Sequence, residues 1–245
     1  MASIEHIDGA FLYDLLTSPR ITRKFFQAVQ FTSRTGREAG FEVHRKIGGP
    51  NTVYPLFRGT NKKVLTTPDI PLEGGDYALL MVHTHPSSDE LHPSAGDLQY
   101  VRFIGYEMHY LHNHISSQPL GGVLHRDEGS DIVSLTLYQC KDPTAPIERL
   151  DELGELEKHI LALQSTNQKT KKMKMLGELE DEANALMKDI WARYFRIGMV
   201  VYQISDGTAT LADVAADFFS KEETKEETIE TRAFLDTFSF SARME

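Results

Sequence analysis

The sequence predicts an α/β protein of the α+β kind, with a mixed sheet flanked by helices and a long helical hairpin as a C-terminal extension. Between residues 40 and 140, short apolar stretches with strand-like alternation recur and turn residues separate them. Helical patterns precede and interrupt these stretches. After Pro146 the apolar residues recur with a period of about 3.6. This order of elements predicts layers of helix and sheet around one core.

Composition limits the class of protein. The chain has 245 residues, 40% of them hydrophobic, enough for a buried core. Its net charge of -10 argues against a nucleic-acid partner, because that affinity rests on Lys and Arg. The N-terminal residues lack the basic start and apolar run of a signal peptide, and the chain has no stretch of about 18 apolar residues. We therefore expect a cytoplasmic protein without a membrane partner.

The first predicted helix covers residues 19–34. Ser18 is a suitable cap and Pro19 fits the first turn, while Ile21, Phe25 and Val29 fall on one helical face. Alternation and turn residues then predict three strands, at Gly40–Ile47, Thr52–Phe57 and Lys63–Thr66.

A nearly continuous apolar run at Ala78–Val82 predicts a central strand that is covered on both faces. A helix is expected next, from Asp97 to about Tyr106. Further strands are expected at His109–Ile115, Gly121–His125 and Ile132–Cys140.

Two amphipathic helices follow Pro146, separated by the polar segment Gln164–Lys172. A short polar link favours an antiparallel hairpin, and the alternative is a coiled-coil homodimer or a partner contact through these helices. Ile197–Ile204 is then predicted as a strand, Ala212–Phe219 as a short helix, and Lys221–Arg232 as a solvated, charged tail. We accordingly divide the chain into residues 1–145, 146–196 and 197–245.

One segment concentrates side chains that bind metals. Because side chains two apart on a strand share a face, His83 and His85 can both reach one ion. Asp97, at the start of the predicted helix, is the natural third ligand. The lone Cys140 excludes a multi-cysteine site. Taken alone, a histidine pair is weak evidence, and Ser94 with Asp97 also fits a helix capping box.

The pattern His83-Thr84-His85-Pro86 followed by Ser94-Ala95-Gly96-Asp97 resembles that of the JAMM, or MPN+ (JAB), metalloproteases, which include deubiquitinases. The resemblance covers roughly residues 20–140. It implies a JAB/MPN-like fold, a sandwich of the cytidine-deaminase-like type. It also implies Zn²⁺ held by His83, His85 and Asp97.

The same resemblance requires an upstream glutamate, and Glu38 and Glu42 are both available. We choose Glu38, which precedes a small residue and a glycine as the family's glutamate does, and Glu42 stays open as the alternative. The implied mechanism is a zinc-activated water whose proton passes to Glu38, with Ser94 bonding the oxyanion.

The substrate implied by this resemblance is ubiquitin or a ubiquitin-like protein, joined through its C-terminal tail to a lysine or a precursor segment. Two alternatives stay open from the sequence. One is a peptidase that processes a small ubiquitin-like or sulfur-carrier protein. The other is a catalytically inactive MPN-type scaffold whose C-terminal helices recruit partners.

Overall fold

The computed structural model describes residues 3–59, 76–86, 92–110, 118–126, 129–164, 171–205, 208–215 and 240–244. The helices are α1 (Gly9–Thr17), α2 (Pro19–Thr35), α3 (Ala95–Tyr110), α4 (Leu150–Gln164) and α5 (Lys171–Tyr194). The strands are β1 (Ser3–Ile7), β2 (Ala39–Lys46), β3 (Asn51–Val53), β4 (Phe57–Arg58), β5 (Asp76–Thr84), β6 (Leu120–His125), β7 (Ile132–Cys140), β8 (Phe195–Ser205), β9 (Thr208–Ala215) and β10 (Phe240–Met244).

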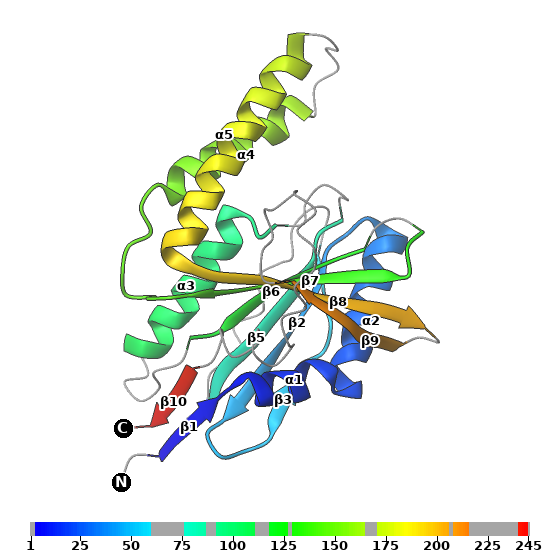
Figure 1. The fold of residues 1–245 in the computed structure, drawn as a ribbon, viewed down its shortest axis with the longest axis vertical. Helices are drawn as coiled ribbons and strands as arrows, with labels where there is room; N and C mark the ends of the chain where they lie inside the picture. Colours follow the sequence, from blue (N-terminus) through cyan, green and yellow to red (C-terminus); the bar gives the residue numbers. More distant parts are fainter. Residues whose placement is uncertain are drawn as a thin grey trace.

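A mixed eight-stranded sheet forms the centre of the molecule (Figure 1). Its strand order is β3-β2-β5-β6-β7-β8-β9, and the short β4 also pairs with β2. β5 and β6 are parallel neighbours, while the other pairs in this order are antiparallel. The parallel pair requires a crossover, which contains α3. β1 and β10 form a separate antiparallel pair that holds the two ends of the chain side by side.

Helix α2 packs inside the curve of this sheet. The ring centroid of Phe25 lies 5.7 Å from that of Phe41 on β2 and 5.2 Å from that of Tyr202 on β8. These two strands are far apart in the strand order, so the sheet must curl for both to reach one helix. All three rings are buried, and they form part of one continuous hydrophobic core.

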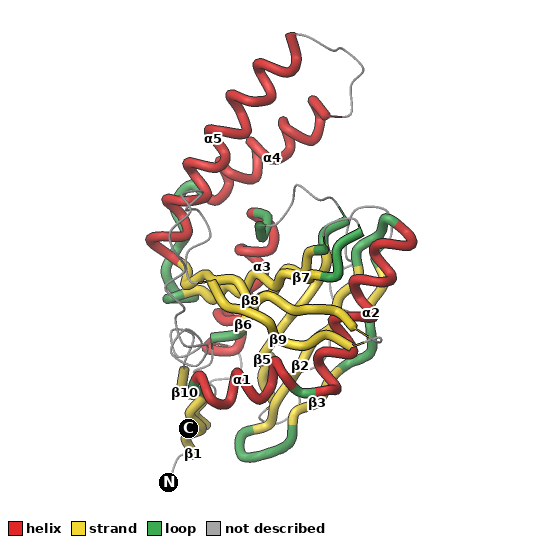
Figure 2. The backbone as a smooth tube through the Cα atoms, turned by 45° about the vertical axis from the view of Figure 1, so that its right-hand side comes forward, coloured by secondary structure: helices red, strands yellow, loops and turns green. Residues whose placement is uncertain are grey.

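Helices α4 and α5 lie side by side as a hairpin that projects away from the sheet (Figure 2). The base of the hairpin is anchored, because Leu153, Ile190 and Trp191 are buried in the common core. α5 runs directly into β8, which pairs with β7 over nine residue positions. The hairpin is therefore inserted between two neighbouring strands of one sheet. No helix in the described part of the chain is long and apolar enough to cross a membrane.

Most of the predicted elements are confirmed. The mixed sheet with flanking helices is present, the first predicted helix agrees with α2 within one residue, and the strand predicted at Ile132–Cys140 has the bounds of β7. The strand expected at Thr52–Phe57 is instead two short strands, β3 and β4. The predicted strand at Lys63–Thr66 and the tail at Lys221–Arg232 lie outside the described residues.

Two predictions were wrong. The helix expected at Ala212–Phe219 begins inside β9, which extends to Ala215 and pairs with β8 from Thr208 onward. A local alanine-rich pattern favours helix, but pairing with a neighbouring strand overrides weak local preference. The strand expected from His109 was also wrong at its start, because α3 continues to Tyr110. The rest of that predicted strand lies outside the described residues.

Candidate metal centre

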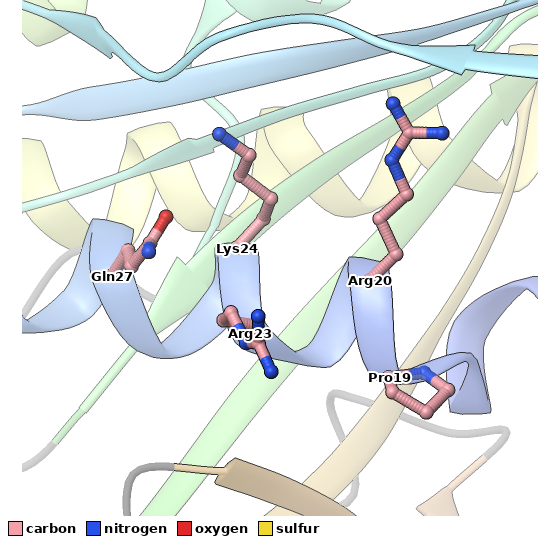
Figure 3. A pocket seen from close by; sticks show the side chains of 5 residues that line it. All are labelled: Pro19, Arg20, Arg23, Lys24 and Gln27. Atoms are coloured by element: carbon pink, nitrogen blue, oxygen red, sulfur yellow. The ribbon is translucent and has the colours of Figure 1, made fainter.

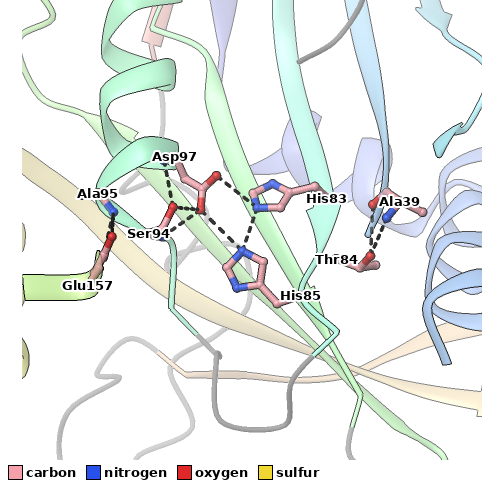
Figure 4. A network of polar contacts seen from close by, with 8 residues as sticks. All are labelled: Ala39, His83, Thr84, His85, Ser94, Ala95, Asp97 and Glu157. Carbon is pink, nitrogen blue, oxygen red and sulfur yellow. Dashed lines mark hydrogen bonds and ion pairs between the residues drawn. The ribbon is translucent and has the colours of Figure 1, made fainter. Parts of the chain in front are cut away.

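Two histidines lie at the carboxyl end of β5, an interior strand of the mixed sheet. His83 is the second-last residue of β5, where it pairs with Gly40 of β2 and with Val123 of β6. His85 follows two residues later and points to the same side (Figure 4). The crossover from β5 to β6 contains α3, so the first turn of that helix returns to this end of the strand. The carboxyl ends of parallel strands are common positions for ligand sites.

The imidazoles of His83 and His85 and the carboxylate of Asp97 converge (Figure 4). The two Nε2 atoms lie 3.0 Å apart. His83 Nε2 is 3.2 Å from Asp97 Oδ1, and His85 Nε2 is 3.5 Å from Asp97 Oδ2. Ligand atoms held about 2.0–2.1 Å from a tetrahedral zinc ion are separated by about 3.3 Å. The three separations between ligand atoms are therefore close to the edges of such a site.

The chemistry of the three side chains also suits a cation. The side chain of His85 is only 8% exposed, that of His83 16% and that of Asp97 22%. Two imidazoles and a carboxylate bring several nitrogen and oxygen lone pairs together. A divalent ion would satisfy all three groups at once, and nitrogen with carboxylate oxygen is a donor set that zinc accepts. The residues present thus fit a bound metal.

Asp97 is held in place by a capping box at the start of α3. The backbone N–H and the hydroxyl of Ser94 donate to Asp97 Oδ2 at 2.7 and 2.8 Å. In return the backbone N–H of Asp97 donates to the Ser94 hydroxyl oxygen at 3.2 Å. The capping interpretation and the ligand interpretation are therefore compatible, because the cap aims the carboxylate at the histidines.

The electrostatics of the site favour a charged Asp97. Burial opposes ionisation of this carboxyl, but attraction and hydrogen bonding from His83 and His85 outweigh it and hold its pKa well below the usual range. The N-terminus of α3 adds the positive end of a helix dipole. Asp97 is thus an anion at neutral pH, as a metal ligand must be.

The sequence offered no sign that Glu157 of α4 belongs to this region. Its two carboxylate oxygens accept from the backbone N–H of Ala95, at 2.9 and 3.2 Å (Figure 4). Ala95 lies between Ser94 and Asp97 in the turn that carries the site. A contact across 62 residues has no local sequence signal, although an acidic residue near a helix N-terminus is a common partner for its N–H groups.

The hairpin also contacts His92, which lies just before the capping box. The His92 ring packs edge-on against Trp191 of α5, with the centroids 5.4 Å apart. Burial, followed by the charges of His85 and Lys188, lowers the pKa of His92 to about 4. His92 is therefore neutral at physiological pH. Both helices of the hairpin thus contact the segment that carries Ser94 and Asp97.

The two candidate glutamates have different surroundings. Glu42 is buried in β2, where its carboxylate contacts His44 Nε2 at 2.7 Å and accepts from the Tyr100 hydroxyl at 3.5 Å. Its neighbour on β5 is Met81, two residues before His83. Glu38 precedes β2 and is half-buried. Glu38 lies two residues before Gly40, which is paired with His83, so the alternation of the strand would direct its side chain to the same face as that histidine.

Gly40 separates these two glutamates and lies opposite His83. A Cβ added at this position would lie 2.6 Å from the Val82 carbonyl oxygen and 3.2 Å from the His83 Cβ. Glycine is therefore required here for close approach of the strands.

The opposite face of β5 carries a different polar cluster. Thr84, between the two histidines, points toward α2, and its hydroxyl contacts that of Thr32. The same hydroxyl oxygen accepts from the Ala39 N–H at 2.9 Å, and the hydroxyl lies 3.2 Å from the Ala39 carbonyl oxygen. This cluster joins α2, β2 and β5 immediately behind the histidines.

Comparison with protein-family models, curated proteins and solved structures found no match to the chain.

Proposed function

We propose that the chain is a zinc-dependent isopeptidase or peptidase of the JAMM kind, with a JAB/MPN-like sandwich fold. It would cleave ubiquitin or a ubiquitin-like modifier from a lysine or from a precursor tail. The observation that carries the proposal is the convergence of His83, His85 and Asp97 at separations close to those of a tetrahedral site. Three protein ligands are the number that catalytic zinc sites use, since one position must stay open.

When bound, zinc supplies the Lewis acidity that lowers the pKa of water and polarises an amide carbonyl. The protein must then move protons. Glu38 would accept one proton from the attacking water and pass it to the leaving amine. Its half-buried position, two residues before the Gly40 that pairs with His83, supports this role. Glu42 suits the role less well because its carboxylate is buried against His44.

Ser94 would donate a hydrogen bond to the oxyanion that develops on the substrate carbonyl. Its hydroxyl donates to Asp97 Oδ2 in this structure. Serving the oxyanion would therefore require the hydroxyl to rotate away from Asp97. The backbone N–H of Ser94 also donates to Asp97 Oδ2, so the carboxylate keeps one of its two bonds from Ser94 during that rotation.

The test combines metal analysis with a cleavage assay. Purified protein is analysed for metal content by mass spectrometry, and the wild type, Glu38→Gln and Glu42→Gln are assayed on a panel of isopeptide-linked ubiquitin-like substrates. We expect one zinc per chain in all three proteins. Cleavage should fall by about 10²–10⁴-fold in Glu38→Gln, the usual contribution of a general base. Glu42→Gln should retain most of its activity.

The outcomes separate the proposal from its rivals. Zinc binding without cleavage of any substrate would favour the scaffold alternative, and cleavage of precursor tails alone would favour the processing peptidase. Loss of cleavage in Glu42→Gln rather than Glu38→Gln would move the general base to Glu42. Binding of added zinc that does not require His83 or Asp97 would overturn the proposal.

A further inference from the structure

Helix α2 carries a row of cations on its outer face. Arg20, Arg23, Lys24 and Arg34 are its four basic residues, and it has no acidic residue. Arg58 of β4 lies beside its C-terminal half, where the guanidinium is 5.3 Å from the Phe31 ring centroid. We call these five cations the basic stripe. Four of them are exposed and Lys24 is half-buried.

The basic stripe borders two shallow hollows that share Lys24 and Gln27 and so form one continuous groove. The first hollow contains Pro19, Arg20 and Arg23 (Figure 3). The second adds Arg34 and Arg58 together with three apolar residues, Phe31, Pro55 and Leu56. From Arg20 to Arg34 the helix rises by about 21 Å, at 1.5 Å per residue. The groove is therefore basic along its length and apolar at one end.

The basic stripe differs from the hairpin in how its cations are paired. None of its five members forms an ion pair with any described residue. On the hairpin, by contrast, Arg149, Lys158, Lys174 and Arg193 each pair with an acidic side chain three or four residues away. The stripe lacks such partners among the described residues, although the chain has more acidic residues than basic ones, 36 against 26.

The arrangement also costs helix stability. Arg20 with Arg23 and Arg20 with Lys24 are spaced three and four residues apart, where like charges repel. All three lie near the N-terminus of α2, where the helix dipole disfavours positive charge, and the first turn has no acidic residue. Local conflicts of this kind are expected at functional sites, where another molecule removes them.

We propose that the basic stripe binds an extended acidic segment of a partner protein, with an apolar residue of that segment next to Phe31 and Leu56. About six extended residues span 21 Å at 3.3 Å per residue. A long nucleic acid fits less well, because it would also run past the remaining surface of a chain with a net charge of -10. This surface is separate from the metal centre, since α2 covers the opposite face of β5.

The test measures the anisotropy of a fluorescent peptide of six glutamates followed by phenylalanine, at low and at moderate ionic strength. The stripe variant is Arg20→Glu/Arg23→Glu/Lys24→Glu. The control variant, Lys158→Glu/Lys174→Glu/Arg193→Glu, changes the net charge equally on the hairpin. We expect the wild type and the control to bind with similar Kd, weakening as salt rises, and the stripe variant to bind at least about tenfold more weakly.

A thermal melt shows that the stripe variant is folded, and its Tm should be equal to or above that of the wild type, because acidic residues suit a helix N-terminus. Replacing the glutamates of the peptide by glutamine should abolish binding. The proposal is overturned if both variants weaken binding equally, if the wild type does not bind the glutamate peptide, or if a single-stranded oligonucleotide binds the stripe more tightly than the peptide. Cleavage activity does not enter this test, so it stands apart from the proposed function.

Discussion

The two faces of β5 at its carboxyl end carry polar side chains with different kinds of partner. On the face toward α2, the Thr84 hydroxyl contacts that of Thr32 and both backbone groups of Ala39. On the face toward α3, His83 and His85 bring two ring nitrogens within 3.0 Å of each other and close to the Asp97 carboxylate. Thr84 and the histidines are adjacent in sequence, yet the first cluster joins hydroxyls to backbone groups, whereas the second gathers side chains of the kinds that can bind a metal.

This difference is the one expected between polar groups that stabilise a fold and polar groups that could bind a ligand. Buried polar groups that satisfy one another stabilise a fold, because each lost partner leaves a desolvated donor or acceptor. Two imidazoles and a carboxylate that converge from two elements form instead a group that could hold a metal ion. Burial alone does not distinguish the two faces, since Thr84 and His85 both have little exposure. The chemical types of the neighbouring atoms make the distinction.

The largest expected effect concerns the α3 face. Asp97→Asn keeps a side-chain oxygen for the capping box but removes the negative charge next to the two imidazoles. Loss of an outer residue that supports a ligand already costs up to about a hundredfold in metal affinity, so we expect zinc affinity to fall by at least that much. The free energy of unfolding should change by about 1 kcal/mol or less. Competition with a chromophoric chelator measures the affinity. An unchanged zinc Kd would remove Asp97 from the site.

The opposite face should respond in the opposite way. Thr84→Val removes a buried hydroxyl with three close contacts, so we expect the free energy of unfolding to fall by about 1–3 kcal/mol in urea denaturation. Zinc affinity should stay within about twofold of the wild type. Thr32→Val is the matched control, because it removes the partner hydroxyl from α2 without altering β5. A large loss of zinc affinity in both variants would mean that the two faces are not independent.

Glu157 tests whether the hairpin contributes to the α3 face. Glu157→Ala deprives the Ala95 N–H of both carboxylate contacts and loosens the turn between Ser94 and Asp97. We expect zinc affinity to fall by up to about tenfold, at the low end for outer partners of ligands. Glu155→Ala, which removes an exposed carboxylate paired with Lys158 on the same helix, should leave zinc affinity unchanged. Partial rescue by Glu157→Gln would indicate that a single acceptor oxygen is sufficient.

Cys140 should show the smallest effect. It is the one cysteine of the chain, and it is buried at the end of β7. Burial raises the pKa of its thiol to about 11, so only about one molecule in a thousand carries the thiolate at pH 8. We expect negligible alkylation by iodoacetamide at pH 8 in the folded protein and rapid alkylation in urea. Fast modification of the native protein would contradict this environment.

Local patterns were sufficient for elements whose own residues decide their structure. Ser18 and Pro19 mark the start of α2, and the alternation of β7 marks both its ends. The patterns failed where a neighbour decides. Residues 212–215 are strand because β8 offers a pairing partner, and β1 forms a ladder with β10, more than two hundred residues away in the chain. Cross-strand pairing has no signature in either strand alone.

The sequence by itself determined which side chains could bind a metal, because His83 and His85 share a strand face and Ser94 with Asp97 encodes a helix start. Their spacing also selected the family that the chain resembles. Only the tertiary structure decided that the start of α3 lies next to the end of β5. It also decided that the Glu42 carboxylate contacts His44 and that Glu157 of the hairpin accepts from the Ala95 N–H. The physical reason is that spacing along a chain specifies directions and faces, whereas distances between elements depend on how the sheet curls and which helices cover it.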